Sequence, residues 1–171
     1  MNANVSSAVA TEPAQYLTFM LAQEQFAIGI LGIKEIIEHQ GVTEVPMMRP
    51  CVRGVINLRG AVVPVVDLLA RFGRASSAVT KRTCVVIVEA GCGSSERQVM
   101  GLLVDAVNEV LDIAPADIEP PPVFGARLRS DFIQGVGKVR GKFVLLLDVD
   151  RVLSIDEIAG VAGAVAETAA A

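Results

Sequence analysis

The sequence contains an internal repeat, and this repeat constrains the fold more than any other feature. Segment 52–72 matches segment 133–153 after a shift of 81 positions, and segment 27–37 matches 101–111 after a shift of 74, which places Glu35 on Glu109. The first match pairs Gly54 with Gly135, Val55 with Val136, Arg59 with Arg140, Gly60 with Gly141, Val63 with Val144 and Asp67 with Asp148. Self-similarity of this kind indicates two copies of one structural unit.

Short runs of Val, Ile and Leu, broken by Gly, Pro, Asp and Asn, predict many short β-strands. Strands at 16–21 and 26–30 would form a hairpin around the polar residues 23–25. Strands at 84–90 and 98–104 would form the equivalent hairpin in the second half. Helices should be few and short, near 68–72 and 149–153, where Asp67 and Asp148 are placed to cap them.

The Arg-Gly pairs 59–60 and 140–141 each separate two apolar runs and predict tight hairpin turns, in which Gly60 and Gly141 adopt positive φ. The following runs, 62–66 and 143–147, are almost wholly apolar, so both faces of these strands should be covered. A half of four or five strands cannot bury this surface alone. Closing each half into a barrel and packing the two barrels together would do so.

We therefore expect an all-β fold of two pseudo-repeated small β-barrel subdomains packed together, with short helices. The domain should span 16–154, with repeat halves at roughly 16–75 and 82–154. Residues 1–15 lack periodicity and residues 155–171 are rich in alanine, so we expect both ends to be flexible. No apolar run approaches the roughly 18 residues of a membrane helix, and no basic segment opens the chain, so we expect a cytoplasmic protein without direct membrane insertion.

Composition argues against several classes of function. A net charge of −4, with one Tyr and no Trp, disfavours nucleic acid as a partner. The three cysteines form no C-x-x-C pair and His39 is the only histidine, so we expect neither a metal site nor a Cys-His or Ser-His nucleophile. No pair of carboxylates is placed to converge on a cleft. The sequence therefore predicts a protein that is not an enzyme and holds no cofactor.

The segment 135–138 (Gly-Val-Gly-Lys) is reminiscent of a phosphate-binding loop, but its spacing is wrong. Phe132 stands where the first glycine belongs, and Val139 follows the lysine where Ser or Thr is needed. The duplication explains these glycines better, because they fall in a hairpin repeated from Gly54 and Gly60. A small-ligand-binding barrel that uses residues 135–138 is the weaker alternative.

Two features could serve a partner. Arg59 could be solvated, or could pair with an acidic residue such as Glu35, and its recurrence as Arg140 favours a structural role in the turn, with a binding role equally open. The apolar residues of 30–37 and of 104–111 are mostly expected in the core. Where these two equivalent segments meet between the barrels, they would also form an apolar groove suited to a helix.

The segment GVINLRGAVVPVVDLLARFG (54–73) resembles the signature of the CheW-like domain, in which an N-L-R-G turn leads into a strand reading V-x-P-V-x-D-L. Segments 32–37, 100–113 and 132–153 also resemble that family, in the same order. The resemblance covers the chain from about residue 16 to residue 153. Lys138 stands where the first-half turn has Asn57.

The resemblance implies two intertwined five-stranded barrels without enzymatic activity. It implies an adaptor that links the cytoplasmic tips of methyl-accepting chemotaxis receptors to the regulatory domain of the histidine kinase CheA, in arrays at the membrane. A receptor helix would lie in a groove formed by Ile33, Glu35, Ile36, Val104, Val107 and Val110. The hairpin turns would support structure or coupling through Gly54, Asn57, Arg59, Gly60, Arg140 and Gly141. The same adaptor in a twitching or biofilm pathway is the remaining alternative.

Overall fold

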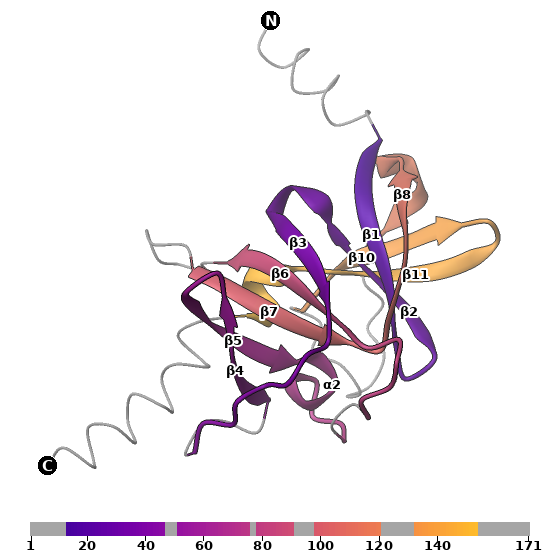
Figure 1. Ribbon diagram of the computed structural model, residues 1–171. Coiled ribbons are helices and arrows are strands. Elements are labelled where there is room, and N and C mark those ends of the chain that lie inside the picture. The colour runs from indigo at the N-terminus through magenta and orange to yellow at the C-terminus, as the bar shows by residue number, and fades with distance from the viewer. Residues whose placement is uncertain (1–12, 47–50, 76–77, 91–97, 121–131, 154–171) are drawn as a thin grey trace, which may run out of the picture.

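The computed structural model describes residues 13–46, 51–75, 78–90, 98–120 and 132–153 (Figure 1). These residues form mostly strands, which confirms the all-β expectation. The strands are β1 (Ala14–Leu21), β2 (Glu24–Gly29), β3 (Ile33–Glu38), β4 (Val52–Leu58), β5 (Ala61–Asp67), β6 (Cys84–Ala90), β7 (Gln98–Val104), β8 (Ala106–Ile113), β9 (Ile118–Glu119), β10 (Ile133–Val139) and β11 (Lys142–Leu147). The helices are η1 (Ile30–Gly32), α2 (Leu68–Arg71), η2 (Pro115–Asp117) and α3 (Val149–Val152).

The strands form two sheets that exchange hairpins between the repeat halves. Barrel I has the order β8-β1-β2-β11-β10-β9, and barrel II has the order β3-β6-β7-β5-β4. The hairpin β1–β2 from the first half thus belongs with strands of the second half, and β6–β7 belongs with strands of the first. Parallel pairing of β2 with β11 and of β5 with β7 joins each exchanged hairpin to its barrel. The expectation that each half closes on itself is therefore wrong, whereas the two intertwined barrels that the resemblance implies are confirmed. Barrel I has six strands where five were expected, because it includes the two-residue strand β9.

Each barrel is closed by the chain that follows its edge strand. After β3, Thr43 crosses to β4 and exchanges two backbone hydrogen bonds of 2.9 Å with Val55. After β8, the two-residue strand β9 pairs with Val136 and Gly137 of β10 in the same way. A Cβ atom added at Gly54 would lie 2.1 Å from the Thr43 carbonyl oxygen. The repeated glycine of the first half therefore permits the closing segment to approach the strand.

Three apolar clusters fill the described part of the molecule. Alternate residues of β1, β2, β6, β7 and β11 point either into their own barrel or into a central core that both barrels share. On β6, for example, Val85 and Ile87 belong to the interior of barrel II, whereas Val86 and Val88 belong to the central core. These strands are buried on both faces, as their continuous apolar runs predict.

The hairpin turns repeat as expected, with one shift in position. Arg59 and Gly60 have φ of 53° and 88°, and Arg140 and Gly141 have φ of 52° and 76°, so the arginines share the left-handed conformation with the glycines. Two consecutive residues of positive φ are typical of a type I′ turn. The β1–β2 turn lies at 22–23, where both residues also have positive φ, and not at the predicted 23–25.

The two short helices begin at the predicted aspartates. Asp67 accepts hydrogen bonds from the backbone N–H groups of Leu69 and Ala70, and Asp148 accepts one from Arg151. Strand β1 begins at Ala14, inside the segment expected to be flexible, while residues 1–12 and the alanine-rich tail lie outside the described residues. Among the described residues, no helix is long and apolar enough to span a membrane.

Candidate functional site

The edge strand β3 of barrel II presents two isoleucines toward the central core. Ile33 pairs with Val88 and Ile36 pairs with Val86, and both valines belong to that core. Directly paired residues of neighbouring strands have their side chains on the same face of a sheet. Ile33 packs against the core, while Ile36 remains 43% exposed at its margin.

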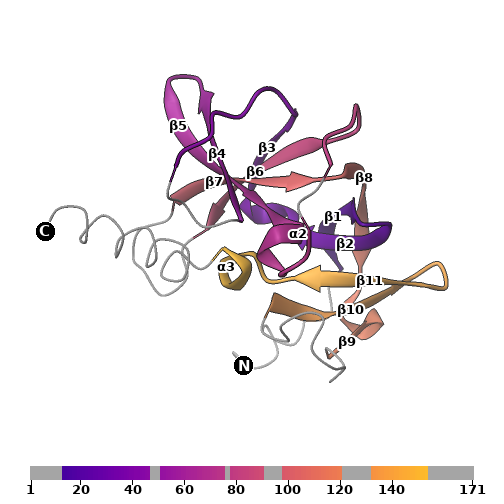
Figure 2. The ribbon, with the colours of Figure 1, turned by 90° about the horizontal axis from the view of Figure 1, so that it is seen from below.

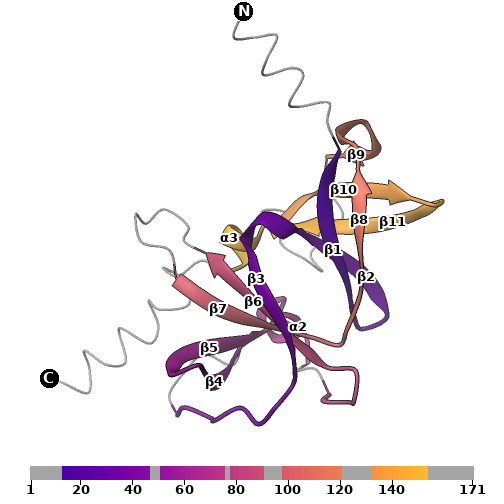
Figure 3. The ribbon, with the colours of Figure 1, turned by 45° about the horizontal axis from the view of Figure 1, so that its top comes forward.

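The edge strand β8 of barrel I presents two valines in the same way. Val107 pairs with Phe19 and Val110 pairs with Leu17, and both partners belong to the central core. Val107 packs against that core, whereas Val110 remains 49% exposed. Figure 3 shows the start of β3, next to η1, beside β1, and β1 in turn pairs with β8. We call Ile33, Ile36, Val107 and Val110 the edge surface.

The other two residues expected in the groove lie elsewhere. Val104 is 0% exposed and sits inside the central core, so it supports the edge surface from within and presents nothing to a partner. Glu35 pairs with Ile87, which belongs to the interior of barrel II, and its side chain therefore leaves β3 on the opposite face from Ile33 and Ile36. Four of the six predicted residues thus lie on the faces of β3 and β8 that border the central core.

Glu35 forms an ion pair with the arginine of the β4–β5 turn. Its Oε2 atom lies 2.7 Å from Nη2 of Arg59, and its Oε1 atom is buried without a hydrogen-bond partner among the described residues. The second half repeats this pair more loosely, with 3.5 Å between Nη1 of Arg140 and Oε1 of Glu109. Of the two interpretations of Arg59, pairing with Glu35 is the one that the structure contains.

The residue two positions before the turn arginine makes a different contact in each half. In the first half, Oδ1 of Asn57 accepts a hydrogen bond of 2.8 Å from the Gly60 backbone N–H. In the second half, Lys138 stands in that place and lies 2.7 Å from Glu119 on β9. The hydrogen bond and the charge of Glu119 raise the pKa of Lys138, so its ammonium group is held in this ion pair.

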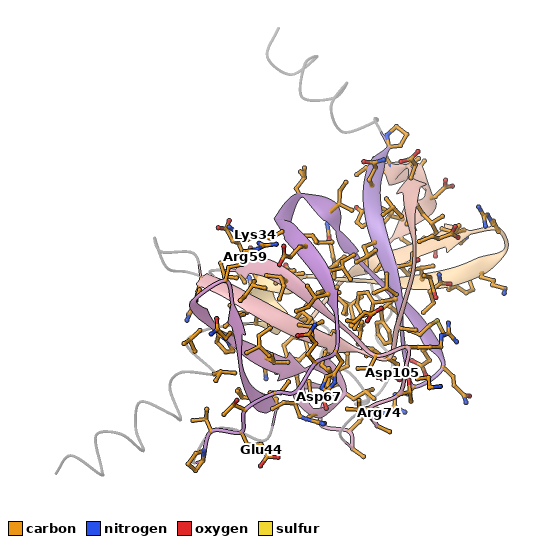
Figure 4. All side chains as sticks on the ribbon, in the orientation of Figure 1. Lys34, Glu44, Arg59, Asp67, Arg74 and Asp105 are labelled. Carbon is orange, nitrogen blue, oxygen red and sulfur yellow. The ribbon has the colours of Figure 1, made fainter. Side chains whose placement is uncertain are left out.

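An open pocket of about 630 Å³ lies at the end of barrel II beside the β4–β5 turn. Figure 4 shows Lys34 and Arg59 together at this end of the molecule. Val62, which follows the turn, is largely exposed, and so is its repeat counterpart Phe143. The pocket is lined by Lys34, Glu35, Leu58, Arg59, Ala61, Val62, Val63, Ile87, Gln98 and Val99. We call Glu35, Arg59 and Val62 the turn surface.

Sequence reasoning did not single out Val62 and Phe143, because each opens a continuous apolar run that the pattern assigns to the core. Their positions directly after the Arg-Gly turns were the available signal, since residues next to a hairpin turn lie at the end of a strand. The remaining turn residues, Gly60 and Gly141, are exposed and adopt the positive φ that the turns require.

The weaker alternative, a phosphate site at residues 135–138, has no support in the structure. These residues lie within β10, where they pair with both β9 and β11, so they form no loop that could surround a phosphate. In the part of the chain that the structure describes, no three His, Cys, Asp or Glu side chains come together as a metal site would require. Cys84 is a free thiol.

The family model described as the CheW-like domain matches residues 15–157. The chain belongs to the CheW-like family. It is 31% identical over 145 residues to the chemotaxis protein CheW of Klebsiella aerogenes, covering 85% of this chain and 84% of that protein. It is 32% identical over 143 residues to the chemotaxis protein CheW of Rhizobium meliloti, covering 84% of this chain and 89% of that protein.

A solved structure shares the fold. The scaffolding protein TtCheW of Thermoanaerobacter tengcongensis superimposes with a TM-score of 0.72 at 32% identity, over 82% of this chain and 87% of that one. Together these similarities confirm the adaptor role in chemotaxis signal transduction. They favour neither the twitching or biofilm pathway nor the ligand-binding barrel.

Proposed function

We propose that this adaptor joins methyl-accepting chemotaxis receptors to the histidine kinase CheA, without catalysis, in the cytoplasm and within membrane-associated arrays. One observation carries the proposal: two edge strands from different barrels expose Ile36 and Val110 on the face that borders their common core. A helix that covers this edge surface would contact both barrels at once and bury apolar area on each.

The kinase would dock on the turn surface. Arg59 is held at the turn by Glu35, and the exposed Val62 stands beside it, so a charged group and an apolar side chain are offered together. Arginine beside apolar contacts is a common composition of interface hot spots. Because Glu35 of the turn surface and Ile36 of the edge surface lie on opposite faces of β3, one adaptor could hold receptor and kinase at the same time.

Coupling in such an adaptor would be a matter of geometry. If binding of the receptor changes the affinity for the kinase by some factor, binding of the kinase changes the affinity for the receptor by the same factor. Each interface could be small and weak, because many repeated contacts in an array add their effects.

The test is a pair of calorimetric titrations, against the regulatory domain of CheA and against a soluble fragment that carries a receptor tip, both from the same organism. Ile36→Asp and Val110→Asp should weaken receptor binding about tenfold or more, because a charge would be buried against apolar groups. Kinase binding should stay within about twofold of the wild-type value. The edge surface would lose its assigned role if both variants bound the receptor normally.

Val79→Asp is the matched control, because Val79 is 47% exposed and lies outside the strands of the edge surface. It should leave both titrations unchanged. Ile33→Asp is a poorer probe, since Ile33 packs against the central core and a carboxylate there would also destabilise the fold. Absence of kinase binding by the wild-type protein would contradict the proposed partner itself.

A further inference from the structure

The two barrels meet again where α2 of barrel II lies next to α3 of barrel I (Figure 2). Phe72, which follows α2, is placed between two phenylalanines of the other barrel. Its ring centroid lies 5.9 Å from that of Phe26 and 5.9 Å from that of Phe132. Tilted aromatic contacts of this kind add burial and attraction, but they tolerate small rotations of one barrel against the other.

Arg71 adds two directional contacts at the same place. Its Nε atom donates a hydrogen bond of 2.7 Å to the carbonyl oxygen of Val152, the last residue of α3. Its guanidinium carbon lies 4.7 Å from the ring centroid of Phe132. The last carbonyl groups of a helix have no hydrogen-bond donor within the helix. Arg71 of barrel II supplies that donor for the Val152 carbonyl at the end of α3 in barrel I.

We propose that Arg71 is the positioning residue that fixes the angle between the two barrels. The inference rests on the proposed function for its consequence. Ile36 and Val110 lie on edge strands of different barrels, so any change in the angle between the barrels changes the spacing of the edge surface. Arg71 lies at the junction of α2 with α3, and acts on that surface through the barrels.

Arginine suits this role better than lysine would. The planar guanidinium can lie over the Phe132 ring while its Nε–H points in the plane toward the Val152 carbonyl. A lysine ammonium in the same position could donate the hydrogen bond to the Val152 carbonyl, but it has no planar group to lie over the Phe132 ring. Arg71→Lys should therefore keep the positive charge but lose the simultaneous contacts with Val152 and Phe132.

The first measurement is of residual dipolar couplings of backbone amides in the full chain, for the wild type, Arg71→Ala and Arg71→Lys. In the wild type, couplings from both barrels should fit one alignment tensor. In Arg71→Ala and Arg71→Lys, each barrel should still fit its own tensor, but the two tensors should differ. Arg74→Ala is the control, since Arg74 lies three residues further on with an exposed side chain, and it should behave as the wild type.

A single unchanged tensor in Arg71→Ala would overturn the proposal, and wild-type behaviour of Arg71→Lys would overturn the need for a planar group. If Arg71→Ala does not fold, as judged by circular dichroism, Arg71→Lys decides alone, and wild-type behaviour of that variant then overturns the proposal.

The second measurement repeats the titrations with the receptor-tip fragment and the CheA regulatory domain. Arg71→Ala should lower receptor affinity about three- to tenfold, in line with the loss of one hydrogen bond and one cation–π contact. Kinase affinity should stay within about twofold, since the turn surface lies within barrel II alone. Unchanged receptor affinity with altered tensors would overturn the link to the edge surface. If the wild-type protein does not bind the receptor fragment, the proposed function fails, while the couplings still decide whether Arg71 fixes the barrels.

Discussion

Gly54→Ala tests whether the barrels are closed by direct backbone contact. Gly54 has φ of 147°, a conformation that residues with a side chain rarely adopt. A Cβ atom on this backbone would lie 2.1 Å from the carbonyl oxygen of Thr43 and 2.7 Å from its carbonyl carbon. These are backbone atoms, so no side-chain rotation can relieve the overlap, and the closing segment must move away from β4.

The size of the effect follows from what this movement breaks. Thr43 and Val55 exchange two backbone hydrogen bonds of 2.9 Å, and each contributes about 1 kcal/mol. An unfavourable backbone conformation at a residue with a side chain adds about 1–3 kcal/mol. We therefore expect Gly54→Ala to lower the free energy of unfolding by about 3–5 kcal/mol, a large part of the roughly 5–15 kcal/mol typical of a native domain.

Urea unfolding followed by circular dichroism measures this loss, and two other glycines calibrate it. At Gly29, which has φ of −63°, an added Cβ meets nothing within 4 Å, so Gly29→Ala should leave stability within about 0.5 kcal/mol of the wild-type value. At Gly135 an added Cβ would lie 2.7 Å from Cγ2 of Ile118 and 2.9 Å from the backbone carbonyl oxygen of Glu119. These contacts are less close than those at Gly54, and Gly135 does not have positive φ, so Gly135→Ala should fall between the two. A loss below about 1 kcal/mol for Gly54→Ala would refute closure by backbone contact.

Three further predictions concern single side chains. Arg59→Ala should weaken receptor-dependent kinase activation in reconstituted arrays while thermal unfolding changes little, because an exposed ion pair contributes about 1 kcal/mol or less; normal activation would remove the turn from the mechanism. Asp67→Ala should lower the free energy of urea unfolding by about 2–5 kcal/mol, because it removes the α2 cap and the carboxylate whose Oδ2 lies 3.0 Å from Nη1 of Arg53. A loss below about 1 kcal/mol would contradict this. Burial and the charge of Glu38 raise the pKa of the Cys84 thiol, so alkylation of Cys84, followed by mass spectrometry, should reach its half-maximal rate at a higher pH than in a cysteine peptide, and Glu38→Gln should lower that pH; a midpoint equal to that of the peptide would count against the assigned environment.

The duplicated turns show how far the sequence alone could be taken. Matching Glu35 with Glu109 and Arg59 with Arg140 identified two residue types that recur together, and the structure pairs them in both barrels. The caps at Asp67 and Asp148 were equally predictable, because each depends on a few neighbouring residues. Features set by local contacts, repeated in the second copy, could be predicted from the sequence.

The exchange of hairpins could not be predicted in the same way. β1 pairs with β2, and β6 with β7, whether or not the hairpins are exchanged, so the apolar pattern of these strands is the same in both arrangements. What distinguishes the arrangements is the parallel pairing of β2 with β11 and of β5 with β7, between strands far apart in the sequence. Periodicity carries information on which face of a strand is buried, and none on which distant strand covers it.

The two faces of β3 escaped prediction for a different reason, and they bear directly on how an adaptor can couple two partners. A bulge between Ile33 and Glu35 makes Lys34 an extra residue, which puts Ile33 and Ile36 on one face and sends Glu35 to the other. In strict alternation, Ile33 and Glu35 would share one face and Ile36 would lie on the other. With the bulge, Glu35 lies in the turn surface and its neighbour Ile36 lies in the edge surface. A displacement of β3 by a receptor helix would therefore move the Glu35 carboxylate that holds Arg59, so the two surfaces are linked through a single strand.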